Sequence, residues 1–220
     1  MLPVPTKREL VAALVSTPDD PWWEDRVLHA RLHPARGRCP SCLTRRRPGH
    51  QPVTAQARTR MCAVLLHDGC LALIRRDRPD GVQHSLPGGL IEPGEDPHAA
   101  LRRELFEELG LNADDLPEPP VLRFVQEQET ERPGESVSFR RRHLVYVAHL
   151  PDHLAAAVAA VEQDDPDRAP VVWLQVADAA ALHLYPDAAA VLDQAVRPDT
   201  AAAGGPLLLP AVTGASYQWC

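Results

Sequence analysis

The sequence lacks any long uninterrupted run of apolar residues. The longest stretch, Leu154 to Val161, is far shorter than the ~20 residues that a membrane-spanning helix requires. The first residues also lack a basic segment followed by an apolar one, which is the pattern of a secretory leader. These absences predict a cytoplasmic protein without a membrane partner.

Acidic residues are absent between His29 and His67, and cysteines are few. Five cysteines at irregular spacing do not form the even-numbered disulfide framework of a small secreted domain. The acid-free stretch contains Arg31, Arg36, Arg38, Arg45, Arg46, Arg47, Arg58 and Arg60. Because the whole chain carries a formal charge of −7, we interpret these arginines as solvated surface rather than as a nucleic-acid-binding arm.

The length and composition predict one globular domain with extensions. The chain has 220 residues, of which 45% are hydrophobic and 24% charged, which is ordinary globular usage. Its 23 prolines are about twice the usual share, so we expect irregular ends. We assign residues 1–58 to an irregular Pro- and Arg-rich extension, 59–196 to the folded domain and 197–220 to a flexible tail.

Two patterns in the central part of the chain predict regular structure. Apolar runs over 61–66 and 70–74 flank a His-Asp-Gly turn and predict a β-hairpin. A helix is expected over 97–109, with Asp96 as its N-cap and Gly110 just after its last turn. Weaker patterns predict strands over 121–126, 144–150 and 171–174, helices over 154–161 and 186–196, and a charged loop over 127–142.

The predicted helix carries a cluster of carboxylates. Glu104, Glu107 and Glu108 stand at i, i+3 and i+4 and therefore share one face. Carboxylates so close together repel one another, so a positive partner is expected. Clustered hard oxygen ligands suit Mg²⁺ or Mn²⁺, which also bind phosphate oxygens and water. The sequence therefore predicts a site for a divalent metal and a phosphate-containing ligand.

The segment before the helix also fits a site for a metal and a phosphate-containing ligand. Gly88 and Gly89 allow the backbone to approach a ligand closely or to adopt a positive φ, and Gly94 allows another tight turn. Arg103 stands beside the acidic cluster and can pair with Glu95. We expect this pair to fasten the loop to the helix.

These residues match the Nudix box, Gly-x5-Glu-x7-Arg-Glu-U-x-Glu-Glu-x-Gly-U, where U is aliphatic. The specified positions are filled by Gly89, Glu95, Arg103, Glu104, Leu105, Glu107, Glu108, Gly110 and Leu111. The domain thus resembles the Nudix hydrolases over residues 59–196. This resemblance implies an α/β/α sandwich with a mixed β-sheet and hydrolysis of a nucleoside diphosphate linked to another group. It also implies a small-molecule nucleotide as partner, with homodimers common among such proteins.

The resemblance further implies roles for individual residues. Glu104, Glu107 and Glu108 would bind Mg²⁺ or Mn²⁺, with the carbonyl of Gly88 as a further ligand. Arg103 and Glu95 would orient the catalytic loop. The general base would be Glu107 or one of four glutamates of the predicted charged loop, which are Glu127, Glu129, Glu131 and Glu135.

Sequence markers of particular substrates are absent. We find no proline of the ADP-ribose type, tyrosine of the dinucleoside-polyphosphate type, or motif of the NADH or coenzyme A type at the expected distances from the box. The sequence therefore predicts a nucleotide or nucleotide-sugar pyrophosphatase and does not specify the substrate further. The alternative is a non-catalytic Nudix-type module that senses a ligand or binds nucleic acid or protein.

A second motif lies in the extension. Cys39 and Cys42 form a Cys-Pro-x-Cys turn that supplies two of the four ligands of a structural zinc site. His29 and His33, or His50, would complete the set. The alternative is a pair of unpaired thiols in a flexible arm.

Overall fold

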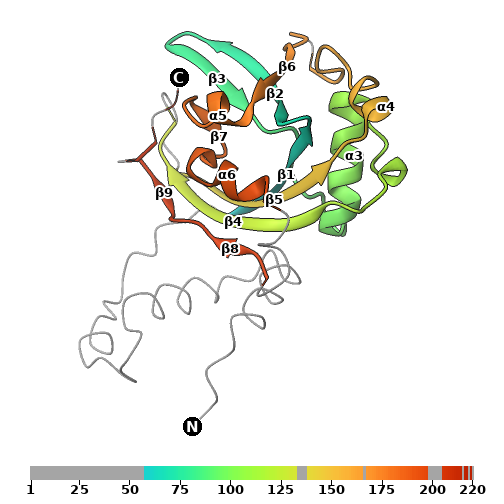
Figure 1. Ribbon diagram of the computed structural model, residues 1–220. Helices are drawn as coiled ribbons and strands as arrows, with labels where there is room; N and C mark the ends of the chain where they lie inside the picture. The colour runs from blue at the N-terminus through green and yellow to red at the C-terminus, as the bar shows by residue number, and fades with distance from the viewer. Residues whose placement is uncertain are drawn as a thin grey trace, which may run out of the picture.

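The computed structural model of the protein describes residues 57–132, 138–165, 167–197, 205–214, 216, 217 and 219. These residues form a mixed sheet with helices on both faces (Figure 1), which confirms the predicted α/β/α sandwich. Nearly all of the predicted extension, including the Cys39 and Cys42 motif with its three histidines, lies outside the described residues, as does Glu135.

The sheet in the described part of the chain has nine strands. They are β1 (Arg58–His67), β2 (Cys70–Arg78), β3 (Gly81–Ser85), β4 (Val121–Thr130), β5 (Phe139–His149), β6 (Val171–Gln175), β7 (Leu184–Tyr185), β8 (Leu207–Leu208) and β9 (Val212–Thr213). Their order is β7-β3-β2-β1-β5-β4-β8, with β6 beside β2 and β9 beside β4. The central pair, β1 and β5, is parallel, whereas β2 and β4 flank it antiparallel.

Alternation along the strands divides the core between the two faces of the sheet. Met61, Ala63 and Leu65 of β1 pack in one cluster with α3 (Pro97–Leu109) and α4 (Asp152–Ala155). Cys62 and Val64, which point to the opposite face, pack with α5 (Val176–Ala179) and α6 (Leu192–Ala195). Figure 1 shows α3 and α4 on one side of the central strands and α5 and α6 on the other. The remaining short helices are η2 (Ala113–Asp115) and η3 (Ala189–Val191).

The predicted hairpin and the predicted helix are both confirmed. The strands β1 and β2 pair antiparallel around the turn, and α3 has the predicted bounds. The side chain of Asp96 accepts hydrogen bonds from the backbone N–H groups of His98 and Ala99, and Gly110 ends the helix at φ 65°. Local capping chemistry therefore accounts for both ends of this helix.

The prediction of a charged loop over 127–142 is wrong for both ends of that range. β4 continues to Thr130 and β5 begins at Phe139, so Glu127 and Glu129 are strand residues. Glu127 lies opposite Arg142 and Glu129 opposite Arg140. Opposite charges that face each other across a ladder stabilise the pairing, which is why this charged segment is a hairpin.

Two helices are shorter than predicted. The helix expected over 154–161 ends at Ala155, because the N–H of Ala159 is bonded to the carbonyl of Leu109 at 2.9 Å instead of continuing the helix. The range 186–196 holds only η3 and α6. The short strands β3 and β7, which pair parallel with each other, were not predicted.

The described part of the C-terminal segment differs from the expected flexible tail. β8 and β9 pair parallel with β4, and the N–H of Leu209 donates to the carbonyl of Val125 at 2.9 Å. Leu209, Val212 and Tyr217 are buried. This segment covers the outer strand of the sheet, whose backbone groups would otherwise be unpaired. Among the residues that the structure describes, no helix has the length and apolarity to cross a membrane.

Candidate active site

The loop that precedes α3 is fastened to β1. The N–H of Met61 donates to the carbonyl of Gly89, and the N–H of Ala63 donates to that of Pro87, both at 2.9 Å. Gly88 has φ 132°, and a Cβ atom at this position would lie 2.2 Å from the carbonyl oxygen of Met61. A Cβ atom at Gly89 would lie 2.1 Å from the carboxylate of Glu104. Gly88 is therefore required by the close approach of this loop to the backbone of β1, whereas a side chain at Gly89 would displace the carboxylate of Glu104.

Glu108 points into the protein beneath this loop. The side chain is almost fully buried, at 5% exposure, and its Oε2 accepts a hydrogen bond from the N–H of Gly88 at 2.6 Å. Burial raises the pKa of Glu108 to about 8, against the opposing effects of Arg60 and of the Gly88 N–H; the charges of Glu162 and Glu104 raise it further. The carboxylate is thus in a place where additional positive charge is needed to keep it ionised.

Arg103 binds several groups of the Nudix box at once. Its Nε and Nη2 donate to the two carboxylate oxygens of Glu95 at 3.1 and 3.0 Å, and Nη2 also donates to the carbonyl of Leu90 at 3.1 Å. Its Nη1 donates to Glu104 at 2.8 Å and to Glu107 at 3.0 Å. The hydrogen bond from Arg103 lowers the pKa of Glu95. The structure thus brings together the loop, the helix and the acidic cluster through one guanidinium.

The three box glutamates occupy different environments on one helix face. The side chain of Glu104 is 12% exposed, and burial raises its pKa against the effect of Arg103. The side chain of Glu107 is 44% exposed and lies at the solvent edge. Together with Glu162, described below, we name these carboxylates the acidic centre.

The donor chemistry of the acidic centre fits a divalent cation. Glu104 and Glu108 are carboxylates whose pKa is raised by burial, and carboxylate oxygens are the ligands that Mg²⁺ and Mn²⁺ prefer. A cation would offset the cost of burying these charges. As they stand, no three acidic, histidine or cysteine side chains of the described chain converge on one point as a metal site; Glu104 and Glu107 are instead held by Arg103.

Of the predicted general-base candidates, Glu107 lies on α3, whereas Glu127, Glu129 and Glu131 lie on β4 or just after it. Glu127 accepts a hydrogen bond from Nε of Arg142 at 2.9 Å. Glu129 accepts one from the hydroxyl of Ser138 at 3.3 Å and lies 3.6 Å from Nε of Arg140. Glu131 follows β4 and lines an open hollow beside the C-terminal segment. The contacts of Glu127 and Glu129 are thus with β5 rather than with the box.

Glu162, which no motif in the sequence marks, lies close enough to Glu108 for its charge to raise the pKa of that residue. It is 2% exposed, and the N–H of the next residue, Gln163, donates to the carbonyl of Glu108 at 2.9 Å. Arg76 donates to Oε1 of Glu162 at 2.5 Å, whereas its buried Oε2 has no hydrogen-bond partner among the described residues. No spacing in the sequence relates this residue to the box, because the chain folds back from α4 to reach it.

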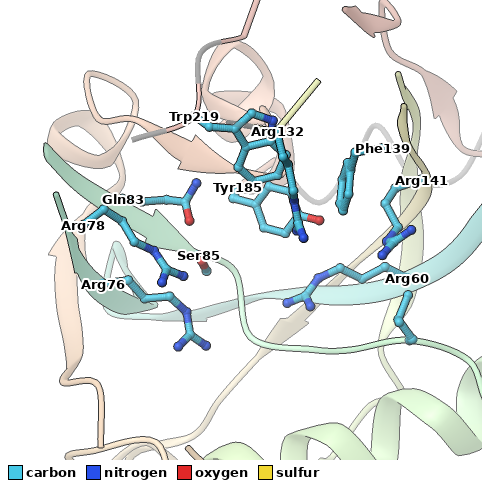
Figure 2. A pocket seen from close by; sticks show the side chains of 11 residues that line it. Arg60, Arg76, Arg78, Gln83, Ser85, Arg132, Phe139, Arg141, Tyr185 and Trp219 are labelled. Atoms are coloured by element: carbon cyan, nitrogen blue, oxygen red, sulfur yellow. The ribbon is translucent and has the colours of Figure 1, made fainter. Parts of the chain in front are cut away.

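An arginine-lined cavity, whose lining residues are shown in Figure 2, adjoins the acidic centre through Arg76, which binds Glu162. Its volume is about 290 Å³, and we name it the arginine pocket. The arginines that line it are Arg60, Arg76, Arg78, Arg132 and Arg141, and its aromatic residues are Phe139, Tyr185 and Trp219. Leu90, which directly follows Gly89 of the Nudix box, also lines the arginine pocket. The arginine pocket and the acidic centre are therefore neighbours.

Comparison with known proteins agrees with the box and the fold. The NUDIX domain model matches residues 56–195, well over half of the chain. The protein belongs to the NUDIX domain family.

Curated relatives match over a shorter range. The nucleoside triphosphatase NudI of Salmonella arizonae is 46% identical over 56 residues, and NudI of Salmonella newport matches to the same extent. The match to the former covers 24% of this chain and 40% of the relative. It therefore spans less than half the length of these relatives.

The fold of this protein resembles that of a solved MutT structure. The MutT protein of Bacillus halodurans has a TM-score of 0.50 at 13% identity, over 69% of this chain and 86% of that chain. A MutT NUDIX hydrolase of Burkholderia pseudomallei is 26% identical over 56% of this chain and 85% of that chain, with a TM-score of 0.42. The similarity to the Bacillus halodurans protein covers most of the described domain and indicates a shared fold.

Proposed function

We propose that the protein is an Mg²⁺-dependent hydrolase that cleaves the pyrophosphate bond of a nucleoside diphosphate linked to another group. The observation that carries this proposal is the burial of Glu108 and Glu104 against the Gly88-Gly89 loop. Two carboxylates buried this closely serve no packing purpose, and they suit a cation that binds phosphate.

Glu104, Glu107 and Glu108 would hold Mg²⁺ or Mn²⁺, with the carbonyl of Gly88 as a further ligand. The metal, when bound, would polarise the pyrophosphate and neutralise charge that develops on its oxygens. Glu107 is the most exposed of the three and is the carboxylate that would accept a proton from the attacking water molecule. Glu162, whose charge raises the pKa of Glu108, is a fourth carboxylate near the same site.

Arg103 and Glu95 would position the loop rather than react. Because Arg103 contacts Glu95, Glu104 and Glu107 at once, it sets the spacing of the carboxylates and restrains the loop. The contact between Arg103 and Glu104 is the most buried of these and is therefore the one that a low local dielectric constant strengthens most.

A nucleotide panel tests the proposal directly. Purified protein is incubated with Mg²⁺ and a set of nucleoside triphosphates, dinucleotides and nucleotide sugars, and the products are separated by chromatography. We expect cleavage of at least one compound at its pyrophosphate bond, lost in EDTA. No cleavage of any compound, together with a salt-sensitive complex with DNA or RNA, would instead establish the non-catalytic binding module.

A further inference from the structure

The C-terminal segment, by which we mean the described residues from 205 to 219, lies beyond the range that the NUDIX domain model matches. That range ends at residue 195. The segment is nevertheless bound to the sheet, because β8 and β9 pair parallel with β4 and lie alongside it in Figure 1. The family fold does not require these residues, so their contacts indicate what they add to this protein.

The segment connects two distant parts of the sheet. Val212 of β9 pairs with β4, whereas the hydroxyl of Tyr217 accepts a hydrogen bond from Nε2 of Gln83 in β3 at 2.8 Å. A turn lies between them, in which Oγ of Ser216 accepts from the N–H of Thr213 at 3.0 Å. The strands β5, β1 and β2 separate β4 from β3 in the sheet. The segment therefore spans the strands that supply most of the arginine pocket.

Trp219 is the described residue of this segment that lines the arginine pocket. Its Nε1 donates to Oγ1 of Thr130 at 3.1 Å, and that hydroxyl also accepts from Nε2 of Gln128, in the sheet, at 3.3 Å. The indole ring lies 5.0 Å from the ring of Phe139 and 5.6 Å from that of Tyr185. One hydrogen bond and two ring contacts therefore fix the indole against the wall of the pocket.

The rings that Trp219 contacts support arginine side chains. Phe139 meets Trp219 edge to face, and Cζ of Arg141 lies 4.2 Å from the centroid of the Phe139 ring. Cζ of Arg132 lies 4.7 Å from the Trp219 ring. A guanidinium that stacks on a ring keeps its N–H groups available at its edge. Figure 2 shows Trp219 beside Arg132 and Phe139 beside Arg141. Trp219 thus restrains the groups that give the pocket its charge.

The pocket is suited to an anion. None of the described residues that line it is a carboxylate, and such a concentration of positive charge favours a negatively charged group. Arg76 lines the pocket and also binds Glu162 of the acidic centre, so a ligand at one site lies beside the other. Side chains that are fixed before binding lose less conformational entropy when the anion arrives. Restraint of the guanidinium groups should therefore strengthen binding.

We propose that the C-terminal segment completes the substrate-binding site and that Trp219 is a positioning residue, which holds Phe139 and Arg141 in the arrangement that binds an anionic group of the substrate. This inference rests on the proposed function. The segment supplies no residue to the Nudix box. Its contribution is therefore to substrate binding, and the chemistry at the acidic centre proceeds without it.

Steady-state kinetics of Trp219→Ala tests the proposal, with the compound of the nucleotide panel that wild type cleaves fastest. Well below the unfolding temperature, we expect KM to rise ~10-fold, because a displaced guanidinium weakens a charge-assisted hydrogen bond. We expect kcat to change less than about twofold. Leu207→Ala, at an exposed position of β8 in the same segment, is the control and should keep the wild-type KM. An unchanged KM in folded Trp219→Ala would overturn the inference.

A conservative variant separates positioning from packing. Trp219→Phe keeps an aromatic ring against Phe139 and loses the hydrogen bond to Thr130, so we expect it to restore KM to within about threefold of wild type. If Trp219→Ala does not fold, Trp219→Leu, which removes less volume, takes its place. A fall in kcat at unchanged KM in any of these variants would contradict the inference.

A double-mutant cycle tests whether Trp219 acts through Arg141. Arg141→Gln should raise KM about as much as Trp219→Ala does, and the double variant should raise it little further, because the indole no longer has a guanidinium to position. Effects on KM that multiply in the double variant would show that the two residues act independently, which would overturn the positioning role.

Calorimetry with inorganic pyrophosphate in EDTA distinguishes the failure of the inference from that of the proposed function. We expect salt-sensitive binding to wild type that Trp219→Ala weakens ~10-fold and Leu207→Ala leaves unchanged. If wild type cleaves no compound of the panel, the proposed function fails, and this measurement still decides the role of Trp219 in the pocket. Absence of binding, or equal binding by wild type and Trp219→Ala, would overturn the inference.

Discussion

The acidic centre and the arginine pocket adjoin each other but are built in opposite ways. The box residues of the acidic centre come from one helix and the loop before it. The arginine pocket is assembled from β1, β2, β5 and the segments around Arg132 and Trp219. One site concentrates buried negative charge and the other positive charge, so the pair is suited to a ligand that carries a cation at one end and an anion at the other.

Burial shifts the pKa values of the two sites in opposite directions. In the acidic centre it raises the pKa of Glu108. On the pocket side it lowers the pKa of Arg141 and brings that of His143 well below 6.5. Arg60 stands between the sites and lowers the pKa of both Glu108 and His143. The charges of each site are therefore costly alone, and a ligand that spans both would reduce the cost of each.

The largest effect is expected at the loop that supports the acidic centre. Gly88→Ala places a Cβ atom 2.2 Å from a backbone oxygen at a φ of 132°, so we expect a loss of about 3–5 kcal/mol of stability, since backbone strain and a clash add. Thermal unfolding measures it. Gly94→Ala is the matched control, because Gly94 has φ 84° with no atom within 4 Å of the new Cβ; we expect a cost of about 1 kcal/mol there. Equal losses would show that the contact with β1 is unimportant.

Glu108→Gln separates the chemistry of the acidic centre from its stability. The amide oxygen can still accept the hydrogen bond from Gly88, and the buried charge is removed, so we expect an unchanged or higher melting temperature. Turnover should fall at least ~100-fold because a metal ligand is lost. Glu118→Gln, at an exposed glutamate outside the box, is the control for activity. Wild-type turnover in Glu108→Gln would contradict the metal-binding role.

The pocket side has its own structural support in the C-terminal segment. Nε1 of Trp219 donates to Oγ1 of Thr130 at 3.1 Å, and the ring contacts Phe139 edge to face. Trp219→Ala should cost about 1–3 kcal/mol, less than a fully buried aromatic residue. Leu207→Ala, at a partly exposed position of β8, should cost under about 0.5 kcal/mol. Chemical denaturation of both variants measures the difference, and an equal cost would mean that the aromatic contacts contribute little.

Local signals explain which features the sequence predicts. The helix α3, its caps and the box are set within one short segment, so spacing and capping residues suffice to predict them. Glu127 to Arg142 was predicted as a loop because its residues are charged, whereas the structure pairs Glu127 with Arg142 across a hairpin. Such pairing depends on register between separate strands, which composition alone does not reveal.

Features that depend on distant contacts were missed. Glu162 reaches the acidic centre because the chain bonds back to the C-terminal end of α3, and no motif marks that position. Trp219 and Phe139 are separated by 80 positions yet share one cluster. The arginine pocket could not be predicted for the same reason, since its members have no fixed spacing along the chain.

The smallest expected effect concerns His143, which lies under the pocket. It is fully buried, its Nε2 is 2.9 Å from Oε1 of Gln128, and burial, then Arg60 and Arg141, lowers its pKa. Below pH ~6.5 the unfolded chain binds a proton that the folded protein does not, so stability falls as pH decreases, by up to ~1.4 kcal/mol per unit from this group. This contribution is absent above pH ~7.5, where both states are neutral.

Replacing His143 tests that pH dependence. Unfolding free energies measured between pH 5 and 8 should show a shallower decline in His143→Gln than in wild type, because the buried group no longer titrates. His149→Gln is the control, since His149 is an exposed residue of the same strand, and it should keep the wild-type slope. If both variants keep that slope, His143 does not carry the effect.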